Sequence, residues 1–121
     1  MGQQVKEFNI QKVIVQYLRA HNYITIDTDI PNALRFFKSQ GQRLAYISER
    51  KSMGWTKGTS DLIAIGHGDI LFIELKRPKG KQSPEQVVFQ KEIVSRGFNY
   101  VVVRSLEDIE KVIEYSNLGE K

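Results

Sequence analysis

The stretch Asp61-Leu-Ile-Ala-Ile-Gly-His-Gly-Asp-Ile-Leu-Phe-Ile-Glu-Leu-Lys76 decides the fold of this chain. Its two ends, 61–65 and 70–76, are runs rich in isoleucine and leucine, and residues 66–69 between them include two glycines and an aspartate. Two β-rich runs joined by a short glycine-containing turn are typical of a β-hairpin. The stretch therefore predicts two antiparallel strands joined by a tight loop.

Charged residues interrupt this apolar hairpin near its open end. Glu74 and Lys76 stand two residues apart on one strand, so both side chains leave the same face of the sheet. A loop of two or four residues places Asp61 opposite Glu74, with Cβ atoms about 4.5–5.5 Å apart. A loop of three residues would instead turn Asp61 to the other face. Whether the two carboxylates meet therefore depends on the length of the loop.

A carboxylate pair beside an ammonium group favours metal-dependent chemistry on phosphate. Two close carboxylates repel each other, and a hard divalent cation removes that cost by taking oxygen ligands from both. The ammonium of Lys76 suits activation of a water or stabilisation of charge that develops on a phosphate. The simpler interpretation of Glu74 and Lys76 alone is an exposed ion pair on the strand.

Glu7 is a further candidate, at the start of a predicted helix over 5–20. It shares a helical stripe with Ile10, Ile14 and Leu18, so it points along the inward face one turn before the core begins. An inward carboxylate could reach the metal directly or through water. The alternative is a residue that only compensates the helix dipole in the first turn.

The rest of the chain predicts a mixed α/β architecture. Alternation predicts a strand over 23–28, and an apolar run predicts a buried strand over 98–103. Ser83 and Pro84 begin a helix that stops at Gly97, and Ser105 begins a last helix over 106–116.

The middle of the chain is less regular. Residues 31–43 are ambiguous and allow a short helix that stops at Gly41. Residues 44–48 predict a short strand, and residues 49–60, which contain two glycines and three basic side chains, predict a loop.

Composition limits the other options for catalysis. The 121 residues include no cysteine and two histidines, which excludes thiol catalysis, disulfides and cysteine-bound metals. No apolar run approaches the ~20 residues that span a bilayer. We expect a single domain over 1–121, soluble in a reducing compartment such as the cytoplasm.

The positive charge is concentrated around the proposed site. The net charge is +4, but residues 35–81 alone carry ten basic and four acidic side chains. Such a segment could bind nucleic acid by neutralising phosphates, or it could be an ordinary solvated surface. The basic residues that we expect to contact phosphates are Arg77, Lys79 and Lys81 directly after the site, with Lys51 and Lys57 before it.

At these residues the sequence resembles the PD-(D/E)xK nuclease superfamily, and within it the VRR-NUC family of virus-type replication-repair nucleases. The resemblance covers most of the chain. Its parts are Glu7 before Ile10-Gln11, Gly58-Thr-Ser-Asp61-Leu, Phe72-Ile-Glu74-Leu-Lys76, Ser83-Pro-Glu-Gln86, and Gly97 before an apolar strand that ends in Val103-Arg104-Ser105. Ser60 departs from the pattern, because the family usually has proline before its aspartate.

The resemblance implies a restriction-endonuclease-like fold, with a mixed β-sheet core flanked by helices. It also implies an endonuclease that hydrolyses DNA phosphodiester bonds with Mg²⁺ or Mn²⁺. By position Asp61, Glu74 and Glu7 would hold the metal, and Lys76 would position the attacking water or stabilise the transition state. Gln86 matches a glutamine beside the family's site, although by itself it could be only a polar residue in the first turn of a helix.

The resemblance also carries expectations about substrate and assembly. Small stand-alone members of phage and bacterial type tend to be homodimers that act on branched DNA, in the host cytoplasm. The alternative function is a non-catalytic DNA-binding module that retains the nuclease fold. Such a module would be expected to lose a metal ligand or Lys76, and the sequence retains these residues.

Overall fold

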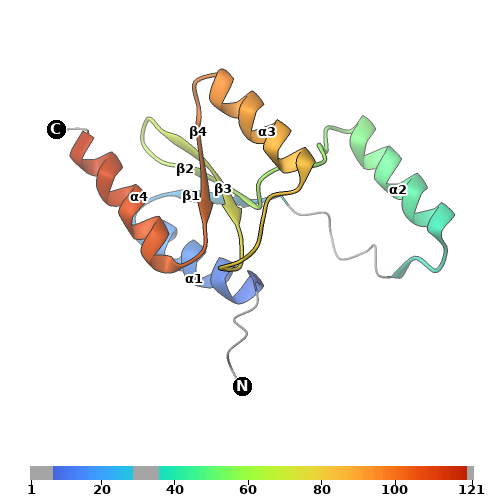
Figure 1. Ribbon diagram of the computed structural model, residues 1–121, viewed down its shortest axis with the longest axis horizontal. Helices are drawn as coiled ribbons and strands as arrows, with labels where there is room; N and C mark the ends of the chain where they lie inside the picture. The colour runs from blue at the N-terminus through green and yellow to red at the C-terminus, as the bar shows by residue number, and fades with distance from the viewer. Residues whose placement is uncertain (1–6, 29–35, 120–121) are drawn as a thin grey trace.

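The computed structural model describes residues 7–28 and 36–119, with side chains over 10–28 and 36–115. Helices and strands alternate along this part of the chain, except that β3 follows β2 directly (Figure 1). In order they are α1 (Glu7–Ala20), β1 (Ile24–Asp27), α2 (Gln40–Ser52), β2 (Leu62–Ile65), β3 (Ile70–Leu75), α3 (Pro84–Ser95), β4 (Asn99–Val103) and α4 (Leu106–Gly119).

The strands form one mixed sheet in the order β1-β2-β3-β4. β2 pairs with both β1 and β3 in antiparallel fashion, whereas β3 and β4 are parallel. Parallel neighbours need a crossover connection, and α3 supplies it. The predicted α/β fold class, a mixed sheet flanked by helices, is confirmed.

The register of the hairpin follows the predicted alternative with a four-residue loop. Ile65 pairs with Ile70 and Leu62 pairs with Ile73, and Gly66 N–H donates to the carbonyl of Asp69 at 2.9 Å. Continuing this register by one residue brings Asp61 opposite Glu74.

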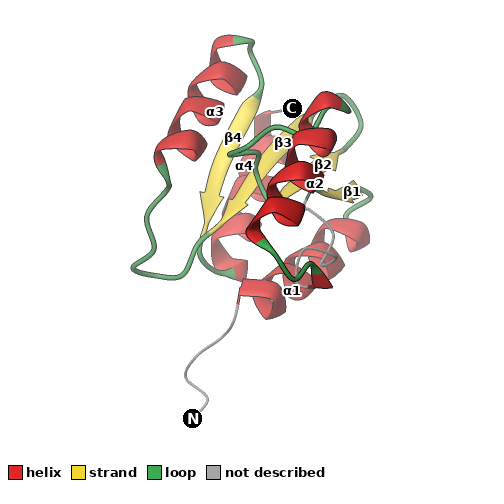
Figure 2. Ribbon diagram, turned by 90° about the vertical axis from the view of Figure 1, so that its right-hand side faces the viewer, coloured by secondary structure: helices red, strands yellow, loops and turns green. Residues whose placement is uncertain are grey.

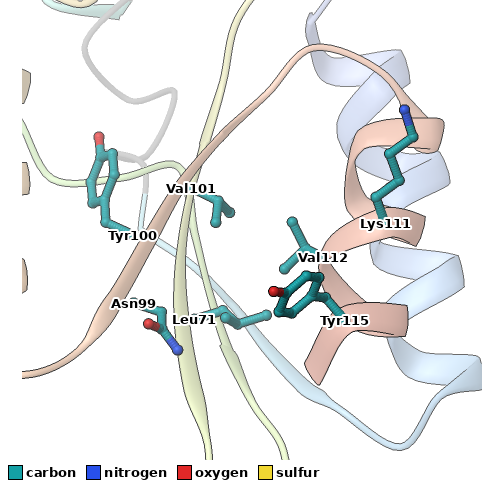
Figure 3. Close-up of a pocket in the computed structure, with 7 residues that line it drawn as sticks. All are labelled: Leu71, Asn99, Tyr100, Val101, Lys111, Val112 and Tyr115. Carbon is teal, nitrogen blue, oxygen red and sulfur yellow. The ribbon is translucent and has the colours of Figure 1, made fainter. Parts of the chain in front are cut away.

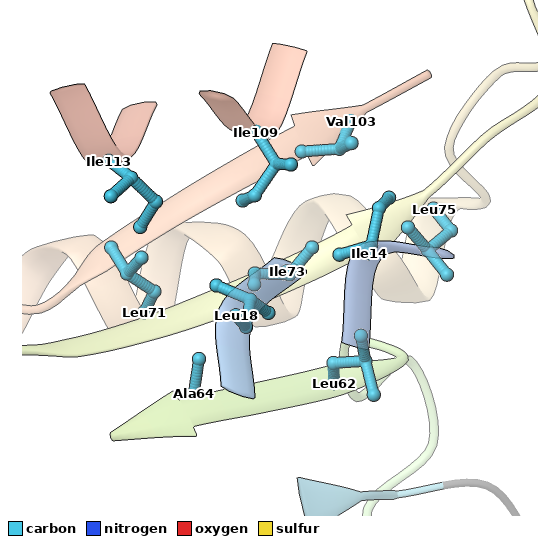
Figure 4. Packing of buried hydrophobic residues seen from close by; sticks show 10 residues of the cluster. All are labelled: Ile14, Leu18, Leu62, Ala64, Leu71, Ile73, Leu75, Val103, Ile109 and Ile113. Carbon is cyan, nitrogen blue, oxygen red and sulfur yellow. The ribbon is translucent and has the colours of Figure 1, made fainter. Parts of the chain in front are cut away.

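The hydrophobic core fills one face of the sheet, between the strands and helices α1 and α4. Side chains at alternate strand positions point to this face, because successive residues of a strand point to opposite sides. Figure 4 shows the core residues Ile14, Leu18, Leu62, Ala64, Leu71, Ile73, Leu75, Val103, Ile109 and Ile113 packed together.

Aromatic rings fill much of the opposite face, which α3 covers. The rings of Phe72 and Phe89 lie 6.0 Å apart, and those of Phe89 and Tyr100 lie 6.2 Å apart, both edge to face. Glu74 and Lys76 belong to this face, since they alternate with Leu75 on β3. The proposed site therefore lies on the side of the sheet away from α1 and α4.

Helix α2 corrects two expectations. The predicted strand over 44–48 is wrong, and so is most of the predicted loop over 49–60, because one helix runs through Gly41 to Ser52. Ser39 caps this helix by accepting from Gln42 N–H. Residues with a high helix propensity, such as alanine, glutamate, arginine and lysine, are frequent over the whole of Gln40–Ser52. Their summed helix propensity outweighs the strand-like pattern of 44–48 taken alone. Residues 31–35 of the ambiguous segment lie outside the described residues.

Four further elements are confirmed within one or two residues at each predicted bound, except that the last helix runs three residues further, to Gly119. They are the strands over 23–28 and 98–103 and the helices that begin at Ser83 and Ser105. The predicted helix over 5–20 is confirmed from residue 7 onward. Within the described part of the chain, no helix is long and apolar enough to cross a membrane.

Candidate active site

Glu74 is the centre of the site and is almost completely buried, with 1% of its surface exposed. Buried carboxylates are rare unless other groups satisfy them. Burial first, and then the negative charge of Asp61, raise the pKa of Glu74 to about 7, against the opposing effect of Lys76. At neutral pH this carboxyl is therefore close to the midpoint of its titration.

Asp61 follows the loop that leads into β2, and the hairpin register brings it to Glu74. Its Oδ2 accepts a hydrogen bond from Leu75 N–H at 2.7 Å, which fixes the side chain across the hairpin. A hydrogen bond between Asp61 and Glu74 also contributes to the raised pKa of Glu74. The predicted meeting of the two carboxylates is confirmed.

Lys76 reaches back to the same group. Its Nζ lies 3.3 Å from Oε2 of Glu74, and its side chain is 15% exposed. The simpler interpretation of an exposed surface ion pair is wrong, because one partner is buried and the other is mostly covered. Partial exposure leaves the ammonium accessible to a molecule that approaches the site.

Gln86 holds Glu74 from the first turn of α3. Its Nε2 donates to Oε2 of Glu74 at 2.6 Å, and its Oε1 accepts from Ser83 N–H at 2.8 Å. The hydroxyl of Ser83 in turn accepts from Gln86 N–H at 3.2 Å, which completes a capping box. The helix start therefore holds the oxygen end of the amide and Glu74 holds the nitrogen end, so Gln86 is more than a polar residue in the first turn.

Tyr100 is a site residue that the sequence reasoning missed. Its hydroxyl lies 3.4 Å from Oε1 of Glu74, and it accepts from Gln82 Nε2 at 3.3 Å. Burial and the charge of Glu74 raise the pKa of the Tyr100 hydroxyl, so it stays protonated and able to donate. The available signal was a tyrosine within an apolar strand, since a buried phenol needs a polar partner.

Ser60, where the resembled family usually has proline, is fully buried beside the site. Its hydroxyl donates to the carbonyl of Leu62 at 3.2 Å, and its own carbonyl accepts from the hydroxyl of Thr28. The serine is thus satisfied by hydrogen bonds, and it holds the entry to β2 against the end of β1.

The donor set suits a hard divalent cation. Asp61 and Glu74 offer carboxylate oxygens at one point. This pair is not part of a larger group, because the described residues contain no cluster of three or more histidine, cysteine or acidic side chains. Mg²⁺ is commonly bound by one or two carboxylates together with water and substrate phosphates. A buried carboxyl whose pKa is raised by burial and by a neighbouring carboxylate is a place where such a cation would replace the proton.

Glu7 stays a prediction. It begins α1, but its side chain lies outside the described residues. Figures 1 and 2 both place the start of α1 near the end of the sheet at which β3 finishes.

The predicted phosphate contacts occupy two different places. Arg77, Lys79 and Lys81 are exposed in the loop that leaves β3. Lys51 is exposed in the last turn of α2, and Lys57 forms an exposed ion pair with Glu85 at 3.4 Å. The first group therefore follows Lys76 directly in the chain, whereas Lys51 lies on a separate helix.

A hollow of about 430 Å³ beside β4 has different chemistry. Figure 3 shows Val112 and Tyr115 of α4 on one side of β4, with Tyr100 pointing to the other side. Its lining contains no carboxylate. We therefore place the candidate active site at Glu74 and not in this hollow.

Comparisons with known proteins agree on the fold. A solved structure described as a VRR_NUC domain superposes with a TM-score of 0.63 at 23% identity, over 92% of this chain and 97% of that one. A second, described as a VRR_NUC domain protein, gives a TM-score of 0.65 at 20% identity, over 93% and 88% of the two chains. No protein-family model and no curated protein matches the sequence.

Proposed function

We propose that this protein is a metal-dependent DNA endonuclease that hydrolyses phosphodiester bonds at the site around Glu74. The observation that carries the proposal is the carboxylate pair of Asp61 and Glu74, with the ammonium of Lys76 3.3 Å from Glu74, at the end of a hairpin. The fold supports it, because similar solved structures are described as VRR_NUC domains.

Asp61 and Glu74 are the proposed ligands of Mg²⁺ or Mn²⁺. When bound, the ion supplies positive charge that offsets the charge developing on the phosphate and lowers the pKa of a bound water. The buried position of Glu74 strengthens every charge interaction at this point, because the local dielectric is low.

Lys76 is the proposed catalytic cation. Its ion pair with Glu74 keeps the ammonium beside the metal ligands, while its partial exposure leaves room for a phosphate or water. In this position the ammonium orients the attacking water, or stabilises negative charge on the phosphoryl oxygens in the transition state.

Gln86 is proposed to keep Glu74 in one orientation, because its amide is held at both ends. Glu7 is proposed as a further carboxylate at the metal, directly or through water. Exposed Arg77, Lys79 and Lys81 are proposed to bind the phosphates on either side of the reacting one.

The decisive experiment incubates the protein with linear, nicked, flapped and four-way branched DNA in Mg²⁺, Mn²⁺ or EDTA. We expect cleavage with either metal, strongest on the branched substrates, and none in EDTA. Glu74→Ala and Lys76→Ala should each lower the rate by a factor on the order of 10²–10³, as expected when a group that stabilises transition-state charge is removed. Glu7→Gln should also lower it.

Matched controls are Glu114→Ala and Lys111→Ala, which remove the same charges from exposed positions on α4. These variants should cut like the wild type. If the wild-type protein binds DNA but cuts none of these substrates, the non-catalytic DNA-binding module replaces the nuclease. Equal cutting by the Glu74 and control variants would remove this site from the mechanism.

A homodimer is the proposed assembly. A second copy of this domain would extend the grip on a large DNA. Light scattering coupled to size exclusion measures the mass directly. A mass of about 14 kDa at working concentration would contradict the dimer.

A further inference from the structure

The segment 36–57, called the α2 arm below, takes no part in the hydrophobic core. None of the residues of α2 is buried. Local contacts hold the arm in shape: Ser39 Oγ accepts from Gln42 N–H at 3.1 Å, and the rings of Phe37 and Tyr46 lie 5.2 Å apart. The arm therefore adds a helix that the sheet does not need for its own packing.

The α2 arm accounts for the whole net charge of the protein. It carries five basic side chains, Lys38, Arg43, Arg50, Lys51 and Lys57, and one acidic side chain, Glu49. The rest of the chain has thirteen basic and thirteen acidic residues, which balance. A neutral remainder with one cationic arm is expected to attract a polyanion at that arm.

Internal needs of the helix explain only part of this charge. Arg50 and Lys51 stand in the last turn, where cations interact favourably with the helix dipole. Lys57 pairs with Glu85 of α3. Arg43, in the first half of the helix, donates from its guanidinium to the carbonyl of Phe37 at 3.2 Å. None of these contacts involves the ammonium of Lys38, which precedes the helix.

The dimensions favour duplex DNA over a single strand. A helix of 13 residues is about 20 Å long, which matches about six base-pair steps. Rigid helices fit the major groove of a duplex. Proteins that bind single strands offer exposed aromatic rings for stacking. In the α2 arm Tyr46 packs against Phe37, but Phe36 is 76% exposed, so the preference for a duplex rests on the length and rigidity of the helix.

The arm lies on the side of the sheet that carries the candidate site. In Figures 1 and 2, α2 and α3 stand on one side of the sheet, while α1 and α4 stand on the other. Glu74 and Lys76 belong to the α3 side. A duplex that reaches the site therefore approaches the face from which the arm projects.

We propose that the α2 arm binds the phosphate backbone of duplex DNA outside the catalytic site. This assignment rests on the proposed function for the identity of the partner, which is DNA. It concerns the binding of that DNA and not the chemical step. The arm contributes affinity for long duplexes, and the carboxylate site acts on the phosphodiester that this grip presents.

The test compares two double variants that each remove two positive charges. Lys38→Gln with Lys51→Gln alters the arm, and Lys12→Gln with Lys111→Gln alters α1 and α4 on the other side of the sheet. Affinity for a duplex of about 30 base pairs, several times the length that the arm spans, is measured in EDTA over a range of salt concentrations. Circular dichroism confirms that each variant is folded.

The arm variant should bind several-fold more weakly, and its plot of log affinity against log salt should be shallower by about 2, near one unit per lost phosphate contact. The other pair should change the slope by much less. Lys51→Glu alone should weaken binding in the same direction. An unchanged slope, equal effects of both pairs, or an equal loss on single-stranded DNA would overturn the proposal.

Two further readouts separate this proposal from the nuclease itself. Hydrolysis of a small phosphodiester, bis(4-nitrophenyl) phosphate, should be unchanged in the arm variant and lost in Glu74→Ala. A wild type that hydrolyses nothing but shows the arm-dependent salt slope would contradict the nuclease and leave the arm as a DNA contact. A changed mass in light scattering would instead identify the arm as an interface between copies of the chain.

Discussion

The carboxyl of Glu74 is held by groups that favour opposite charge states. Lys76 and Gln86 favour the ionised form, while burial and Asp61 favour the protonated form, and the second pair of effects prevails. Above neutral pH, without a metal, two like charges face each other in a buried place. A cation resolves this conflict, which gives the site a physical reason to bind one.

This conflict predicts how the stability of the metal-free protein depends on pH. The pKa of Glu74 is about 7 in the folded state and near its ordinary 4.5 when unfolded. The folded state therefore holds its proton more tightly, and the free energy of unfolding should fall as pH rises from about 5 to 8, by at most about 3 kcal/mol. Denaturant titrations in EDTA at a series of pH values measure the change.

Glu74→Gln should flatten this pH dependence and be more stable than the wild type at pH 8, because the buried carboxylate charge beside Asp61 is then removed. Glu114→Gln on the exposed side of α4 is the control and should keep the wild-type profile. Parallel profiles for the wild type and Glu74→Gln would show that Glu74 does not cause the change.

Gln86 has two roles that neighbouring variants can separate. Gln86→Ala removes both the cap of α3 and the hydrogen bond to Glu74, whereas Ser83→Ala removes only the cap acceptor. Each should lose about 1 kcal/mol of stability. Only Gln86→Ala should also lose nuclease activity. The activity is measured on the best DNA substrate and divided by the fraction of each variant that is folded. Similar activity losses in both would reduce Gln86 to a capping residue.

The loop before β2 joins two elements of the site. Gly58 has a φ of 86°, and a Cβ at this position would collide with the backbone carbonyl of Glu85 at the start of α3. Gly54 has a φ of 110° with open space around it. Both glycines therefore have a positive φ that other residues rarely adopt. Only Gly58 also lets the loop that carries Asp61 contact the helix that carries Gln86.

Gly58→Ala and Gly54→Ala test this close approach. Both should lose about 1–2 kcal/mol for the left-handed backbone. Gly58→Ala should lose more, and it should lower nuclease activity as well, because the start of α3 must move away. Thermal unfolding and cleavage assays compare the pair, and equal losses would mean that the contact with α3 is unimportant.

Elements differ in how far the sequence determined them. The hairpin was predictable as two antiparallel strands, but its register stayed open, because loop length fixes which residues face each other and the sequence allowed loops of different length. Helix α2 was not, because a reading of 44–48 alone gives a strand while the longer window favours a helix. The contact between Tyr100 and Glu74 could not be predicted from the sequence either. It depends on the parallel pairing of β3 with β4, which are joined through α3.

For the molecule as a whole, the proposed metal is a ligand of the folded state. An ion that binds only the native protein at about 100 times its Kd stabilises it by about 2.7 kcal/mol. We expect Mg²⁺ or Mn²⁺ to raise the melting temperature, more strongly above pH 7, where the ion does not compete with the proton on Glu74. Asp61→Asn and Glu74→Gln should lose this shift, and a shift that survives in both would place the ion elsewhere.

The topology of the sheet also sets an order in which the site is assembled during folding. Asp61 and Glu74 meet when a hairpin closes over four residues, whereas Gln86 and Tyr100 arrive only after the crossover through α3. Short loops close at less entropic cost than long ones, so local pairing comes first. We expect the chain to bring its two acids together early and to add the neutral donors late, so that completion of the crossover is also the step that completes the site.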